Sequence, residues 1–123
     1  MLIQNQELLL ENTLHHIRLG MTLNAYERLS GYVFLFPYKE NAALVGYAGL
    51  LCYLLWAEAK STEARERYLQ LALDHLKSSL LLDGQNSLFL RLHVKLLSVT
   101  SATHGLETLR QASIDYPDNT SIC

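Results

Sequence analysis

Apolar residues recur three or four positions apart along most of the chain, which is the spacing of one face of an α-helix. Only the run Gly31 to Phe36 resembles a strand, and Pro37 directly after it is unfavourable in a central strand. The sequence therefore predicts an all-α fold of helices joined by short turns. The predicted helices cover residues 4–19, 22–34, 41–60, 62–82, 87–98 and 104–114.

Several residues mark the predicted helix ends. Gly20 ends the first helix, Pro37 stops the second, and Asp83-Gly84 ends the fourth. Asn41 is placed to cap the third helix, and Thr62 begins the fourth with acidic residues in its first turn. Short turns between successive helices favour antiparallel neighbours, so the six helices form about three hairpins.

The third predicted helix contains no charged residue between Ala42 and Ala57. A membrane span, a buried core and a binding surface are all consistent with such a run. Its sixteen residues reach roughly 24 Å as a helix, which is short of the ~30 Å hydrocarbon core. Gly46, Tyr47 and Gly49 dilute the run, and no cluster of Lys or Arg flanks it. We therefore expect no membrane insertion and a helix that is covered on several sides.

The last hairpin resembles a tetratricopeptide unit, a helical repeat of about 34 residues. With Pro117 at the terminal proline, apolar and small residues fall where two closely crossing helices need them, and only His93 departs badly. The matching positions are Phe89, Leu92, Leu96, Gly105, Leu109 and Ala112. The first hairpin matches this frame poorly and the middle one moderately.

The same frame predicts a stacked, tetratricopeptide-like array over one domain, residues 1–123. About a dozen extra residues, from Trp56 to Glu66, lie between the matching halves of the middle hairpin. We therefore expect this hairpin to be elongated, with the third and fourth helices the longest in the chain.

Charge and cysteine content limit the ligands and the cellular compartment that are expected for this chain. The net charge is −2 and the pI is near 6.2, so no basic field attracts phosphate backbones, and nucleic acid is not expected as a ligand. The N-terminus lacks a basic segment ahead of its leucines, so no secretory signal is expected. Cys52 and Cys123 are expected to be free thiols in a reducing cytoplasm.

No motif for catalysis is present. The sequence contains no G-x-S-x-G, no glycine-rich phosphate loop and no C-x-x-C. His15 and His16 are adjacent and point to different helix faces, whereas a helical metal pair needs a spacing of four. We expect a non-catalytic protein without metal or cofactor.

In a tetratricopeptide array the concave face is formed by the first helix of each hairpin. The corresponding positions here are nearly all apolar or small, which favours binding of an amphipathic helix in an apolar groove. A bundle that closes on itself would bury the same residues and remains the alternative. The predicted groove residues are Leu10, Leu14, Ile17, Ala43, Gly46, Leu50, Tyr53, Leu90, Val94 and Leu97.

A short chain of degenerate tetratricopeptide hairpins with an apolar concave face resembles the small chaperones of bacterial type III secretion, a virulence apparatus. It is most similar to the needle-subunit chaperones of the YscG type. This resemblance implies a bacterial cytoplasmic chaperone in a hetero-oligomer with a secreted needle-type subunit and a small helical co-chaperone. It also implies that masking an amphipathic helix of the subunit prevents premature polymerisation.

Two other function classes stay open. A generic tetratricopeptide adaptor or scaffold would share the same architecture and differ in its partner. A small helical enzyme would be favoured by a perturbed ionisable group in a closed pocket.

Overall fold

A computed structural model describes residues 2–100 of the chain, and these residues contain helices, turns and no β-strand. The α-helices are α1 (Leu2–Arg18), α2 (Thr22–Ser30), α3 (Ala42–Glu58) and α4 (Thr62–Leu82), with the short 3-10 helix η1 (Tyr38–Glu40) before α3. Residues 87–100 are also helical. The all-α prediction is confirmed for this part of the chain. The sixth predicted helix, with Gly105, Leu109, Ala112 and Pro117, lies outside the described residues.

The chain divides into two compact units, Met1–His93 and Val94–Cys123. Of the second unit only residues 94–100 are described, so the expected single domain over residues 1–123 stays a prediction. The stacked tetratricopeptide-like arrangement stays a prediction for the same reason.

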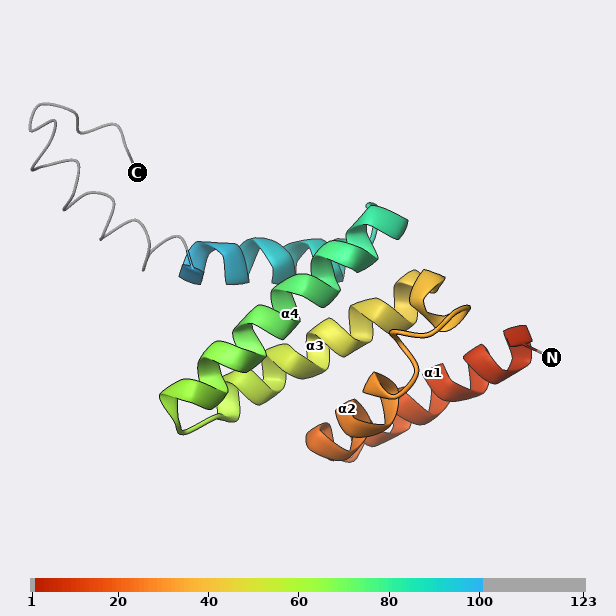
Figure 1. Cartoon of the computed structure of the whole chain (residues 1–123), viewed down its shortest axis with the longest axis horizontal. Coiled ribbons are helices and arrows are strands. Elements are labelled where there is room, and N and C mark those ends of the chain that lie inside the picture. The colour runs from red at the N-terminus through yellow and green to blue at the C-terminus, as the bar shows by residue number, and fades with distance from the viewer. Residues whose placement is uncertain (1, 101–123) are drawn as a thin grey trace, which may run out of the picture. The chain divides into compact units, whose positions relative to one another are not determined.

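The hairpin of α3 and α4 is the centre of the first unit. The two helices run antiparallel and side by side (Figure 1), and each begins with a side-chain cap. Asn41 Oδ1 accepts a hydrogen bond from the Leu44 backbone N–H at 3.1 Å, and Ser61 Oγ accepts one from the Ala64 N–H at 3.1 Å. The Asn41 cap is confirmed, whereas the cap of α4 is Ser61, with Thr62 as the first helical residue.

Close approach of the two helices depends on a glycine. A Cβ atom on Gly49 would lie 2.7 Å from Leu76 Cγ, so only glycine fits at this crossing. Leu76 is fully buried at this crossing, and Leu44 and Leu51 are fully buried elsewhere on α3. At the open end of the hairpin, Ser79 Oγ donates a hydrogen bond to the Ala42 carbonyl oxygen at 2.6 Å.

The first pair of helices packs on this hairpin, because α2 contacts both α1 and α3, and α1 also touches α3. Leu29 is fully buried in α2, while Leu9 and Thr13 are buried on α1. Asn41 joins α1 to the start of α3, because its Nδ2 donates to Gln6 Oε1 at 2.8 Å. The prediction that helices adjacent in sequence pack together is confirmed within this unit.

Two sequence expectations need correction. The second helix ends at Ser30 rather than near Phe34, because Gly31 follows it and its backbone N–H bonds to the carbonyl oxygens of Arg28 and Leu29. Residues 31–37 form turns, in which Val33 is nevertheless buried. At 21 residues α4 is the longest helix in the described part of the chain, but α1 and α3 have 17 residues each, so α3 is no longer than α1.

Candidate functional site

The predicted groove residues of α3 lie on a side of the helix that the rest of the first unit covers incompletely. Ala43, Leu50 and Tyr53 are half-buried, and so are Tyr47 and Leu54 beside them. We call these five residues the α3 stripe. Their spacing of three or four positions places them along one side of the helix. The stripe contains no charged side chain, so its uncovered surface is apolar apart from two tyrosine hydroxyls.

Gly46 differs from the other predicted groove residues of α3. It is buried, and the ring of Phe89 occupies the space where a Cβ atom would lie. Phe89 also contacts Tyr47 edge to face, with ring centroids 5.3 Å apart. Gly46 therefore packs against an aromatic ring of its own unit, and it is not an open groove position.

The remaining predicted residues come from α1 and from residues 87–100. Leu10, Leu14 and Ile17 are all half-buried on α1. In the first unit Leu90 has 45% of its surface exposed. In the second unit Val94 and Leu97 are 55% and 43% exposed, whereas Leu96 is buried.

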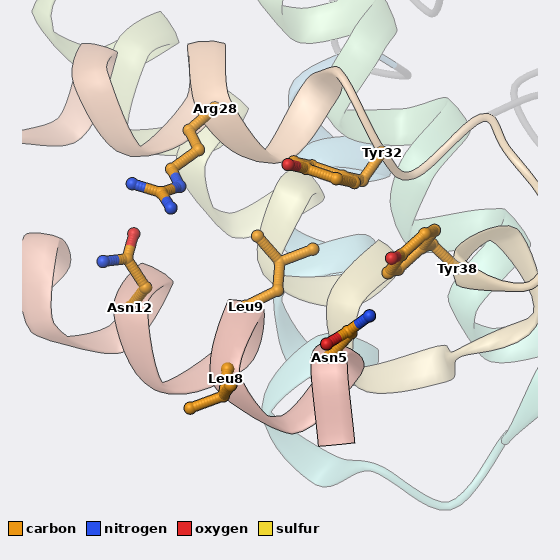
Figure 2. A pocket seen from close by; sticks show the side chains of 7 residues that line it. All are labelled: Asn5, Leu8, Leu9, Asn12, Arg28, Tyr32 and Tyr38. Atoms are coloured by element: carbon orange, nitrogen blue, oxygen red, sulfur yellow. The ribbon is translucent and has the colours of Figure 1, made fainter. Parts of the chain in front are cut away.

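A cavity of about 380 Å³ lies between α1, the end of α2 and η1 (Figure 2). No motif in the sequence predicts this cavity. Its lining combines one cation, two amides, two phenols and two leucines, and it is open to solvent. The lining residues are Asn5, Leu8, Leu9, Asn12, Arg28, Tyr32 and Tyr38.

Arg28 and Asn12 face one another across this cavity. Figure 2 shows the guanidinium group of Arg28 reaching from α2 toward the side-chain amide of Asn12 on α1. Asn12 Oδ1 is buried and accepts no hydrogen bond from the described residues. On the other side of the cavity, the rings of Tyr32 and Tyr38 meet edge to face with centroids 5.1 Å apart.

The cavity and the predicted groove residues lie on opposite sides of α1. Successive residues of an α-helix are about 100° apart around its axis. Leu8 and Asn12 therefore share one side, and Leu10, Leu14 and Ile17 share the side opposite. The regular spacing of residues 5, 8, 9 and 12 was visible in the sequence, but the approach of Arg28 and Tyr38 depends on tertiary packing.

A second polar group lies in the core between α2, α3 and α4. The Tyr26 hydroxyl lies 3.1 Å from His75 Nε2 and donates to it when the ring carries its proton on Nδ1. Burial lowers the pKa of His75, although Asp74 opposes this change. Burial also raises the pKa of the Tyr26 hydroxyl, with a contribution from its hydrogen bond to Cys52.

Cys52 completes this cluster from α3. Its thiol is fully buried and is not paired in a disulfide. Burial raises the pKa of this thiol to about 12, and the hydrogen bond to Tyr26 opposes the increase. None of Tyr26, Cys52 and His75 lines the cavity of Figure 2. The groups whose pKa values shift are therefore separated from the solvent-accessible cavity.

Metal-ligand clusters and membrane-spanning helices are absent from the described part of the chain. Residues 2–100 contain no group of three or more His, Cys, Asp or Glu side chains that could hold a metal ion. His16 Nδ1 instead lies 2.9 Å from the Asn12 backbone oxygen, one turn earlier in α1. No helix within residues 2–100 has the length and apolar character needed to cross a bilayer.

Comparison with protein-family models gives no match for this chain, and comparisons with curated proteins and with solved structures give none either.

Proposed function

We propose that the protein is a non-catalytic binding module that holds an amphipathic helix of a partner protein along the α3 stripe. The observation that carries this proposal is the incomplete cover of a helix with no charged residue between Ala42 and Ala57. An apolar strip that the fold leaves partly uncovered is costly in water and is a typical feature of an interaction site. A partner helix with apolar residues at i, i+3, i+4 and i+7 would match it.

The partner that we propose is a secreted needle-type subunit, held with a small helical co-chaperone in the bacterial cytoplasm. This part of the proposal rests on the resemblance to type III secretion chaperones. It is supported by the all-α fold and by α2 packing on both α1 and α3, as successive helices do in a repeat array. An interface of about 800 Å² per partner would be of standard size.

A generic adaptor or scaffold is the second candidate, because the α3 stripe would serve any amphipathic helix. An enzyme is less favoured by the geometry. The residues with shifted pKa values, Tyr26, Cys52 and His75, lie in the core and away from the open cavity. Their hydrogen bonds and burial are sufficient to explain those shifts.

The test is co-purification of native partners with the full chain, followed by mass spectrometry. Changing Leu50 and Leu90 together to Asp should abolish partner binding and leave the helical circular-dichroism signal unchanged. Leu81→Asp is the matched control, because Leu81 is 80% exposed on α4 and lies outside the α3 stripe. This control variant should bind as the unchanged chain does.

The outcomes separate the candidates. Capture of a small secreted subunit supports the chaperone, whereas capture of a resident component of another complex supports the adaptor. If the double variant unfolds, Leu50 and Leu90 belong to a closed core, and the binding proposal fails. If it stays folded and still binds the partner, the α3 stripe is not the binding surface.

A further inference from the structure

The cavity of Figure 2 carries a positive charge that no residue in the described part of the chain neutralises by an ion pair. Among residues 2–100, Arg28 is the only charged residue in the lining, and it makes no ion pair with any of them. A guanidinium group presents a planar set of N–H donors, and a carboxylate matches this set better than a neutral ligand group does. The charge of the lining therefore favours an anionic ligand, and its geometry favours a carboxylate.

Asn12 adds a second requirement: Arg28 needs an acceptor in the ligand, whereas Asn12 needs a hydrogen-bond donor. Its Oδ1 atom is buried at the cavity and has no donor among the described residues. A buried acceptor without a donor destabilises the protein, and because Oδ1 is sealed from solvent, a ligand N–H or O–H group satisfies it only when the Asn12 amide turns into the cavity. Arg28 and Asn12 point toward one another in Figure 2, so one small molecule can meet both groups.

The rest of the lining limits the size and shape of this molecule. A cavity of about 380 Å³ is at the lower end of the range for small-molecule sites. Leu8 and Leu9 offer an apolar surface for a short aliphatic chain, and the hydroxyls of Tyr32 and Tyr38 can donate or accept hydrogen bonds. A small branched or linear acid would fit these features.

We propose that this cavity binds a small free carboxylic acid that carries an O–H or N–H donor on the adjoining carbon, an α-hydroxy or α-amino acid. The carboxylate pairs with Arg28, the adjoining donor bonds to Asn12 Oδ1, and a short aliphatic chain packs on Leu8 and Leu9. The site is independent of the proposed partner surface, because none of its lining residues belongs to the α3 stripe.

The experiment titrates the full chain with matched probes and follows the amide signals of the lining residues by two-dimensional NMR. 2-Hydroxy-4-methylpentanoate and leucine carry both groups and should shift these signals. 4-Methylpentanoate lacks the donor and leucinamide lacks the carboxylate, so each should bind at least about tenfold more weakly. If no probe shifts these signals at millimolar concentration, the proposal is wrong.

Three variants assign the effect to the cavity. Arg28→Gln should abolish binding, whereas Arg18→Gln removes the same charge from α1 at an exposed residue outside the lining and should have no effect. Asn12→Leu should weaken 2-hydroxy-4-methylpentanoate and leave 4-methylpentanoate unchanged. Unchanged affinity in Arg28→Gln, or equal weakening of both acids in Asn12→Leu, would overturn the assignment.

A last probe separates a free acid from the end of a polypeptide chain. N-acetylleucine carries a carboxylate beside an amide N–H, as the C-terminal residue of a peptide does. Binding equal to or weaker than that of leucine supports the free acid. Binding at least about tenfold tighter would assign the cavity to a chain end and contradict the proposal.

Discussion

The aromatic ring of Phe89 lies against the α-carbon of Gly46, in the space that a Cβ atom would need. This contact joins α3 to the helical residues that follow α4 within the first unit. The ring is almost fully buried, with 2% of its surface exposed, so it cannot move aside without opening the packing around it.

Gly46→Ala should therefore destabilise the first unit by about 1 to 3 kcal/mol through overpacking against Phe89. Urea denaturation followed by circular dichroism measures this change. Gly31→Ala is the matched control, because Gly31 is exposed and has a φ of −68° that alanine adopts without strain. We expect its effect to stay within about 0.5 kcal/mol. Equal midpoints for the Gly46→Ala variant and the unchanged chain would contradict the Phe89 contact.

The stability of the protein should depend on pH through His75. Because burial lowers its pKa in the folded state, the unfolded chain binds a proton more readily. The free energy of unfolding is therefore highest above the unfolded pKa of about 6.5. It should decrease as the pH falls from there toward the folded pKa, by at most about 1.4 kcal/mol per pH unit.

Denaturant midpoints measured between neutral and mildly acidic pH test this dependence. His75→Gln keeps a hydrogen-bond acceptor for the Tyr26 hydroxyl but does not titrate, so it should lose the part of the slope that belongs to His75. If the variant and the unchanged chain have parallel pH profiles, the buried histidine is not the source of the slope.

Asn41 should contribute to stability through both ends of its side-chain amide. Its Oδ1 caps α3, and its Nδ2 donates to Gln6 on α1. Asn41→Asp retains the cap acceptor and loses the donor, whereas Asn41→Ala loses both. Loss of an N-cap costs about 1 kcal/mol, so thermal denaturation should rank the unchanged chain first and Asn41→Ala last. A reversed order of the two variants would exclude the capping role.

Cys52 should react slowly with alkylating reagents in the folded protein. Its thiol is fully buried and its pKa of about 12 leaves almost no thiolate at neutral pH. In a Cys123→Ser background, labelling of Cys52 should be at least about a hundredfold slower than in urea. Mass spectrometry follows the reaction. Rapid labelling without denaturant would show that the α3–α4 hairpin opens readily.

The helix boundaries that depend on local chemistry were predictable from the sequence. Asn41 was identified as a cap, Gly20 ends α1 with a φ of 75°, and Asp83 follows α4 as expected. Pro37 predicts too long a second helix, because the backbone hydrogen bonds change to the i→i−3 type at Gly31 and Tyr32, where the helix ends.

The candidate site was less predictable, for a physical reason. A helix that is apolar on all sides carries no periodic signal for which side a neighbour covers, so Gly46 could not be distinguished from Leu50. The cavity was missed because its cation and its orphaned amide come from different helices. Only the packing of α1 on α2 brings Arg28 and Asn12 together.

The uniform apolar surface of α3 has a consequence for biosynthesis. The ribosome makes the chain from the N-terminus, so α3 is complete when Glu58 has been added, before any part of α4 exists. Until α4 is synthesised, the residues that pack around Gly49 have no partner on that side. The nascent chain therefore passes through a stage at which the apolar surface of α3 is exposed to other nascent chains and to general folding factors. Slow translation of residues 61–82 would prolong this stage and lower the yield of folded protein.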